Sequence, residues 1–186
     1  MAKKALVLLA DGFEEVEAVT PVDYLRRAGI EVTVASITEN LTVKGARAGL
    51  QVLAEIALSN LSAADGGWDA VILPGGMPGA ANLAASKETT SLLKNMAAAG
   101  KLICAICAAP AVVLAPLGLL AGKKFTCYPG MEEKVTEGTW SDNRVVVDGN
   151  LITSRGAGTA GEFSIAVIKA LLGDEAGDKI AGSVLL

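Results

Sequence analysis

The sequence of 186 residues contains no histidine and only three cysteines. Without histidine, the chain cannot form a Cys-His or Ser-His dyad, a metalloprotease helix or a histidine-containing zinc site. Three cysteines are too few for a four-cysteine zinc site, and an odd number in a chain of this length does not make a disulfide framework. The sequence therefore excludes these histidine-dependent sites, and the free cysteines fit a reducing compartment.

The chain also has few aromatic residues, no long apolar run and no basic cluster. Aromatics make up 4% of a chain that is 52% hydrophobic, so small aliphatic side chains must fill the core of what we expect to be one domain. No apolar run approaches the roughly 20 residues that span a bilayer, and the N-terminus lacks a signal peptide pattern. The net charge is −4, which disfavours nucleic acid and anionic membranes as partners. We expect a cytoplasmic protein with a small soluble ligand.

Strand patterns alternate with helix patterns along the chain. A continuous apolar run over residues 4–10 predicts a strand that is buried on both faces, and we expect further strands over 31–36, 68–73 and 102–106. Between and after them we expect helices over 14–28, 83–99, 111–115, 160–172 and 174–183, short strands or a hairpin over 41–53, a hairpin over 144–153, a strand over 125–128 and a short helix over 131–135. This order predicts an α/β fold, a three-layer sandwich around a mostly parallel sheet.

Ligands bind beyond the carboxyl ends of the strands in such sheets. Three segments follow predicted strands at that edge, namely residues 11–17, 74–79 and 107–110. We therefore expect these three segments to converge on one site.

Residues 102–110 are the most informative stretch, because an apolar strand breaks at Cys107 into alanines and a proline. A sharp turn between a strand and a helix lifts its central side chain out of the sheet, beside the unpaired N–H groups of the helix. The partial positive charge of that helix end predicts a lowered pKa for Cys107. A free cysteine is more often a small buried hydrophobe, but Pro110 in the first turn and the small neighbours Ala108 and Ala109 favour a nucleophile.

Three acids open the first predicted helix. Glu14 and Glu15 fit a solvated first turn that complements the helix dipole. Glu17 lies one helical turn from Phe13 and can instead face the ends of the sheet. A carboxyl group buried beside a cysteine has a raised pKa and can share a proton with the thiol. In a chain without histidine, Glu17 is the best candidate for a general acid and base.

Adjacent glycines follow the predicted strand 68–73. They fit either a plain tight turn or an oxyanion site in which the N–H groups of Gly75, Gly76 and Ala108 point at an anionic oxygen. The run matches neither a dinucleotide fingerprint nor a P-loop, so we expect no nucleotide cofactor. Cys104 and Cys107 have the C-x-x-C spacing of a dithiol, but Cys104 falls inside the predicted strand, which disfavours that interpretation.

The motifs together resemble the ThiJ/PfpI superfamily and, within it, the DJ-1 branch and its bacterial relatives. The resemblance rests on Gly12-x-Glu14-Glu15-x-Glu17, Leu73-Pro-Gly-Gly76, Ala105-Ile-Cys-Ala-Ala-Pro110 and Thr153-Ser-Arg-Gly156-x-Gly158-Thr159, and it covers nearly the whole chain. It implies one flavodoxin-like domain over residues 1–186, of the class I glutamine amidotransferase-like type, that forms a homodimer.

The resemblance also implies roles for individual residues. Cys107 matches the reactive cysteine, Glu17 its protonated carboxyl partner, and Gly75, Gly76 and Ala108 the backbone oxyanion site. Arg27 and Arg47 match arginines near the pocket and the dimer interface. Tyr128 stands where the branch commonly has a histidine before a proline, which argues against a histidine proton shuttle and against the peptidases of the superfamily.

Members of this superfamily are cofactor-independent glyoxalases that turn methylglyoxal into lactate, protein deglycases, and oxidative-stress sensors or redox chaperones. We therefore predict an enzyme that uses Cys107 and Glu17, without cofactor or metal, on methylglyoxal or its glycated adducts. The alternative is a redox sensor in which Cys107 is oxidised to sulfinic acid.

Overall fold

A computed structural model describes residues 2–47, 49–61 and 67–186. Its main sheet has seven strands in the order β10-β11-β7-β6-β1-β2-β5. Neighbouring strands are parallel except for β10, which is antiparallel to β11. The strands are β1 (Lys4–Leu9), β2 (Glu31–Ser36), β5 (Ile56–Ala57), β6 (Ala70–Leu73), β7 (Leu102–Ile106), β10 (Val145–Asp148) and β11 (Leu151–Ser154).

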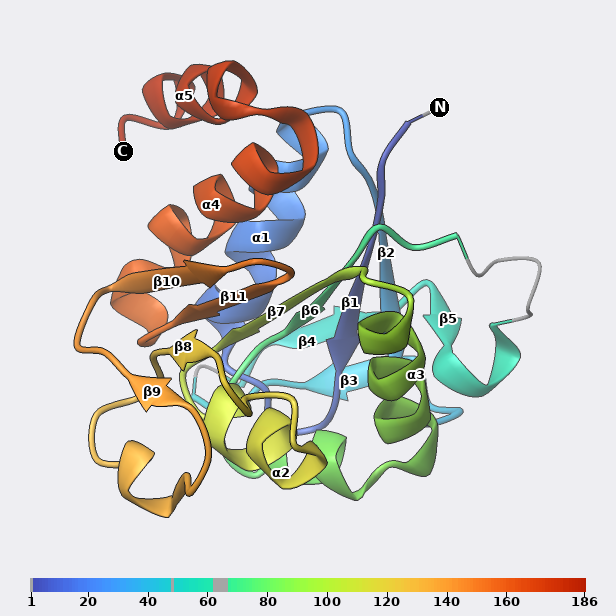
Figure 1. Cartoon of the computed structure of the whole chain (residues 1–186). Coiled ribbons are helices and arrows are strands. Elements are labelled where there is room, and N and C mark those ends of the chain that lie inside the picture. Colours follow the sequence, from blue (N-terminus) through green and yellow to red (C-terminus); the bar gives the residue numbers. More distant parts are fainter. Residues whose placement is uncertain (1, 48, 62–66) are drawn as a thin grey trace.

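Helices cover both faces of this sheet (Figure 1). One face carries α1 (Glu15–Arg27) and α4 (Ala160–Leu172), with α5 (Asp174–Ser183) packed on α4. The other face carries α2 (Gly79–Ala85), α3 (Lys87–Ala98) and the helical turns between Pro110 and Leu117. In β1, Val7 packs into the first layer and Leu8 into the second. The predicted flavodoxin-like sandwich is confirmed, because strands buried on both faces need two helical layers.

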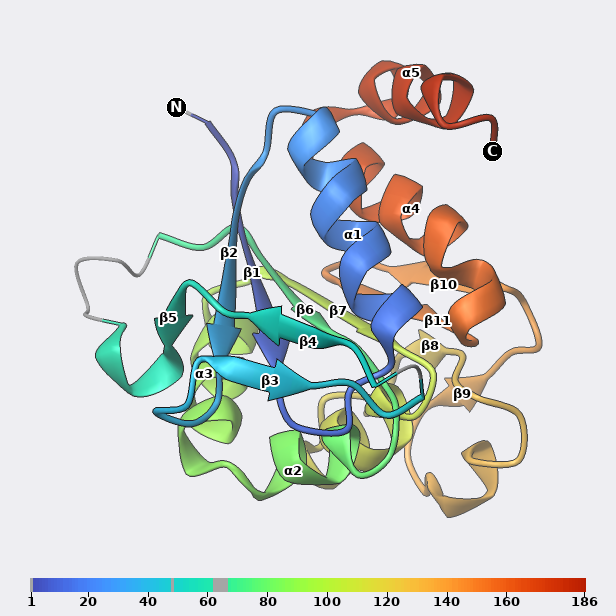
Figure 2. The ribbon, with the colours of Figure 1, turned by 180° about the vertical axis from the view of Figure 1, so that it is seen from behind.

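The hairpin of β3 (Thr42–Lys44) and β4 (Gln51–Leu53) crosses in front of the sheet toward the start of α1 (Figure 2). Its loop is bonded to the turn after β1. The Gly12 N–H donates to the Lys44 carbonyl at 2.8 Å, and the Ala46 N–H donates to the Phe13 carbonyl at 2.8 Å. A second small sheet pairs β8 (Lys124–Phe125) with β9 (Thr139–Trp140).

Several predicted boundaries are wrong. The single helix over 83–99 is two helices, because Ser86 is extended and its hydroxyl caps α3 by accepting the Thr89 N–H at 3.1 Å. The helix expected to stop before Pro116 continues as a 3₁₀ turn through Leu117, since a proline in the first turn needs no N–H partner. The strand 125–128 is reduced to β8, and β9 was not predicted. No helix in the described residues is both long and apolar enough to cross a bilayer.

Candidate active site

Cys107 forms a sharp elbow directly after β7. Its φ is 63°, in the left-handed region that non-glycine residues seldom occupy. The Cys107 N–H donates to the Ser154 carbonyl at 2.9 Å, and the Cys107 carbonyl accepts the Tyr128 N–H at 2.8 Å. Both hydrogen bonds hold the strained residue in place while its side chain leaves the sheet and stays partly exposed. The predicted strand–elbow–helix arrangement is confirmed.

Glu17 lies in the first turn of α1 and is fully buried, with 0% exposure. The Glu17 N–H donates to the Glu14 Oε2 at 2.7 Å, and this hydrogen bond caps the helix. Its Oε2 accepts the Gly75 N–H at 2.8 Å, while its Oε1 has no hydrogen-bond partner within the described part of the chain. The Cys107 side chain and the Ala157 N–H face this carboxyl group. Glu17 therefore points toward the thiol, as predicted.

Gly75 lets the three segments approach one another. A Cβ at this position would lie 2.6 Å from the Cys107 Cβ, 2.7 Å from the Glu17 Oε2 and 2.9 Å from the Ala108 nitrogen. Any side chain would therefore push the acid and the thiol apart. The predicted convergence of residues 11–17, 74–79 and 107–110 is confirmed. We call the space over the thiol, bordered by Glu17, Gly75 and Tyr128, the Cys107 crevice.

The ionisation of the pair differs from the prediction for Cys107. Burial raises the pKa of Glu17 to about 7, against the opposing effect of the Gly75 N–H. Burial also raises the pKa of Cys107, and the charge of Glu17 raises it further. The predicted lowering is wrong, because the N–H groups of Gly76 and Ala108 do act on the sulfur but the desolvation outweighs them. The helix after the elbow is also only a five-residue π-helical turn.

The two groups therefore titrate as a unit. After the pair has lost one of its two protons, the remaining proton is shared between a carboxyl and a thiol that face each other. A nucleophilic sulfur is formed when Glu17 takes up the proton of Cys107, which is activation of a nucleophile by a neighbouring general base.

The predicted oxyanion donors are divided between two tasks. The Gly75 N–H is already bonded to Glu17, so it holds the acid in position. The N–H groups of Gly76 and Ala108 face the sulfur and lower its pKa. These two groups are the donors that remain for a negative oxygen formed next to the sulfur.

The other predicted site residues lie at different distances from the thiol. Tyr128 is 53% exposed and its backbone is bonded to Cys107. Arg47 lies in the loop over the start of α1, where its N–H donates to the Glu15 carboxylate at 3.0 Å. Arg27 is paired with Asp23 at 2.7 Å at the far end of α1, about 15 Å along the helix axis from Glu17. The role of the two arginines at a dimer interface stays a prediction.

Two features of the site were not predicted. Glu15 is 5% exposed and holds the loop at Arg47, so its predicted place in a solvated turn is wrong. Nothing in the local pattern of α1 signals this, because the loop that covers Glu15 is about thirty residues away. The Ala157 N–H that faces Glu17 was also missed, since it belongs to the turn after β11. No group of three or more potential metal ligands occurs among residues 2–47, 49–61 and 67–186.

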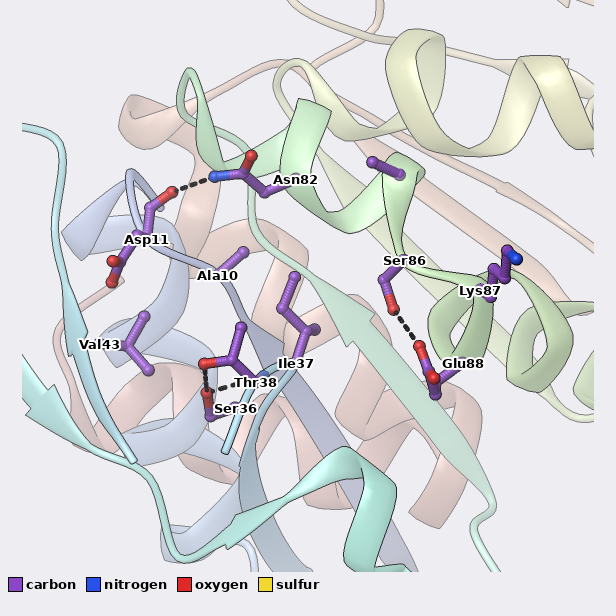
Figure 3. A pocket seen from close by; sticks show the side chains of 11 residues that line it. Ala10, Asp11, Ser36, Ile37, Thr38, Val43, Asn82, Ser86, Lys87 and Glu88 are labelled. Carbon is purple, nitrogen blue, oxygen red and sulfur yellow. Dashed lines mark hydrogen bonds between the residues drawn. The ribbon is translucent and has the colours of Figure 1, made fainter. Parts of the chain in front are cut away.

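A depression lies at the carboxyl ends of β1 and β2, and we call it the β1–β2 hollow (Figure 3). Its volume is about 600 Å³. Most of its polar side chains are exposed and bonded to one another or to the backbone. Asn82 donates to the Asp11 carbonyl at 2.9 Å, and the Ser86 hydroxyl donates to Glu88 at 3.2 Å. None of the predicted site residues lines this hollow.

Comparison with known proteins gives a consistent result. The Drosophila melanogaster protein dj-1beta is 43% identical over 188 residues, which cover 100% of this chain and 98% of that protein. A Caenorhabditis elegans protein named glutathione-independent glyoxalase DJR-1.2 is 39% identical and covers 93% of this chain and 91% of its own length. The solved structure of oxidized Toxoplasma gondii DJ-1 superimposes with a TM-score of 0.94 at 41% identity, covering 99% of this chain and 98% of that one.

The chain spans less than half of two Arabidopsis thaliana relatives. It covers 41% of DJ-1 homolog B, at 42% identity over 181 residues, and 47% of DJ-1 homolog A, at 41% identity over 186 residues. Residues 3–170 match the DJ-1/PfpI family. With the elbow cysteine, the buried acid and the glycine between them in one crevice, the chain belongs to the DJ-1/PfpI family, in its DJ-1 branch.

Proposed function

We propose that this protein is a cofactor-independent glyoxalase that converts methylglyoxal into lactate and also accepts methylglyoxal adducts. The observation that carries the proposal is the Glu17 carboxyl, which is fully buried, fixed by Gly75 through one oxygen, and faces the partly exposed Cys107 side chain. The relative named glutathione-independent glyoxalase supports the same activity.

The first step joins the sulfur to the substrate. The Cys107 Sγ attacks the aldehyde carbon, C1, while Glu17 accepts the thiol proton. The electron pair of the C=O bond moves to the oxygen, which the N–H groups of Gly76 and Ala108 stabilise. Protonation of this oxygen by Glu17 gives a thiohemiacetal.

The second step moves hydrogen between neighbouring carbons. Glu17 takes the proton from C1 to give an enediolate with its charge on the C2 oxygen. The hydroxyl proton on the C1 oxygen moves to the C2 oxygen, and Glu17 returns the carbon-bound proton to C2, which leaves a lactate thioester on Cys107. Water then cleaves the thioester and restores the thiol. C1 is oxidised and C2 is reduced within one molecule, so the reaction needs no external oxidant.

Turnover of methylglyoxal to lactate by the purified protein tests this proposal. Cys107→Ala and Glu17→Gln should each abolish lactate formation, and Cys104→Ala should keep most of it, because Cys104 is buried inside β7. In the wild type, kcat/KM should rise as the pH passes about 7, where Glu17 becomes able to accept a proton. Undiminished turnover in Cys107→Ala or Glu17→Gln would reject the roles given to them.

A second candidate function is the sensing of peroxide, and the relative accessibility of the cysteines favours it. Cys107 is partly exposed, whereas Cys104 and Cys127 are buried, so peroxide reaches Cys107 more easily. Peroxide should therefore add two oxygens to Cys107 first, giving a sulfinic acid. Mass spectrometry after mild peroxide treatment measures this order, and earlier modification of Cys104 or Cys127 contradicts it.

We also propose a homodimer in the cytoplasm. Val16 and Val19 on α1 are 48% and 49% exposed, and Leu50 and Leu53 near and on β4 are 54% and 73% exposed. Apolar side chains grouped over α1 and the β3–β4 hairpin suit a second copy of the chain. Light scattering should give twice the chain mass, and Val19→Asp with Leu53→Asp should reduce it to one.

A further inference from the structure

Gly156 lies opposite the thiol in a well-fixed turn. Strand β11 ends at Ser154, which is paired with β7 and accepts the Cys107 N–H. The Gly156 carbonyl accepts the Thr159 N–H at 2.8 Å, and its own N–H donates to the Thr159 hydroxyl at 3.2 Å. Its φ of 165° and ψ of −170° are extended values that any residue adopts. The backbone therefore does not require glycine here.

The packing does not require glycine either. A Cβ on Gly156 would lie 3.6 Å from the Tyr128 Cδ2, 3.8 Å from the Glu17 Oε1 and 4.0 Å from the Cys107 Sγ. These are ordinary van der Waals contacts, unlike the clashes of 2.6 to 2.9 Å that a side chain on Gly75 would make. A methyl group would fit, but it would fill the space that adjoins the ring, the acid and the thiol together.

This space also contains an unsatisfied polar atom. The Glu17 Oε1 is buried and has no hydrogen-bond partner among the described residues. Buried polar atoms in folded proteins nearly always have one. The position that a Gly156 side chain would occupy lies 3.8 Å from this oxygen, so a molecule bound there can supply that partner.

We infer that the space over Gly156 is the subsite for the C2 end of an α-oxoaldehyde, R–CO–CHO, and that the missing side chain of Gly156 sets the size of R. The inference rests on the proposed function. Once C1 is bonded to the sulfur and its oxygen faces Gly76 and Ala108, C2 must lie beside the Glu17 Oε1, because this oxygen moves the proton between the two carbons. Gly156 and Tyr128 then form the wall around R. The R groups of glyoxal and methylglyoxal, hydrogen and methyl, differ by the one carbon that this position accommodates.

The test compares Gly156→Ala with Gly158→Ala. Gly158 lies two residues away, and a Cβ there meets nothing within 4 Å. Gly156→Ala should lower kcat/KM for methylglyoxal by about 10- to 200-fold, the usual effect of one methyl group in a pocket. It should affect glyoxal, in which R is hydrogen, by less than about threefold. Gly158→Ala should change neither, and circular dichroism should show both variants folded. An equal loss for glyoxal and methylglyoxal overturns the subsite.

A second measurement does not depend on glyoxalase activity. Iodoacetamide and its N-benzyl derivative alkylate a thiol at the same carbon but differ in size. In Gly156→Ala, alkylation of Cys107 by the N-benzyl reagent should slow by about tenfold relative to iodoacetamide, while Gly158→Ala should keep the wild-type ratio. If the wild type turns over neither aldehyde but this ratio changes, the proposed function fails and the subsite stands. If the ratio is unchanged, the subsite is wrong even when turnover is present.

Discussion

The Cys107 crevice and the β1–β2 hollow lie at the same edge of the sheet but differ in almost every physical respect. The crevice holds a carboxyl with 0% exposure, a residue with a strained backbone and an oxygen without a hydrogen-bond partner in the described part of the chain. The hollow encloses about 600 Å³ between mostly exposed side chains that are bonded to one another. The difference shows that the chemically reactive place in this fold is marked by buried titratable groups and unpaired polar atoms, and not by the volume of a pocket.

The largest expected effect is that of one methyl group in the crevice. Gly75→Ala should destabilise the protein by about 1–3 kcal/mol, as overpacking does. It should lower turnover about 100-fold or more, because a shift of about 1 Å in reacting groups is enough for that loss. Gly182→Ala is the matched control, since a Cβ there meets nothing within 4 Å. Denaturant unfolding and lactate formation measure both effects, and a fully active Gly75→Ala enzyme would show that the crevice is looser than the contacts indicate.

The second test contrasts a carboxyl from each region. The pKa of Glu17 is about 7 in the folded protein and 4.5 as the ordinary value, so the folded state binds more protons between these two pH values. Its contribution to the free energy of unfolding is therefore greatest below pH 4.5 and falls by about 3 kcal/mol as the pH rises through 7.

Glu17→Gln should remove this loss, so that the variant gains stability over the wild type as the pH rises from 5 to 8. Glu88→Gln, which removes an exposed carboxyl in the hollow, is the control variant. Urea unfolding at several pH values measures the three curves. Parallel curves for wild type and Glu17→Gln would mean that the burial of Glu17 does not destabilise its charged form.

The smallest expected effect is in the hollow itself. Thr38→Val combined with Glu88→Gln alters two of the exposed side chains that line it. Surface changes of this kind usually alter stability by less than about 0.5 kcal/mol. Methylglyoxal turnover should therefore stay within about twofold of the wild type. A larger drop in turnover would show that the side chains of the hollow influence the reaction at Cys107, and the two regions would then not be independent.

The residues that could be predicted from the sequence are those whose signal is local. Strand β2 and helix α5 have the predicted bounds, since the pattern of each is contained within one element. The elbow at Cys107 and the inward position of Glu17 also follow from nearby residues. These positions belong to the local motifs by which the family is recognised.

The features that could not be predicted depend on contacts between distant segments. The direction of the Cys107 pKa shift follows from burial by other elements, and the Gly75 N–H is taken by an acid 58 residues away. The burial of Glu15 depends on the loop that folds over it. The break at Ser86 was not predicted, because its hydroxyl caps α3 by accepting the Thr89 N–H. A serine inside a helical pattern does not by itself indicate such a cap.

The backbone of Cys107 is tied on both sides to segments that come later in the chain. Its N–H reaches Ser154 and its carbonyl reaches Tyr128. During synthesis, these two partners leave the ribosome after the cysteine does. Until then, nothing holds the backbone of Cys107 in its strained conformation. The reactive geometry is therefore assembled only when translation of the domain is nearly complete.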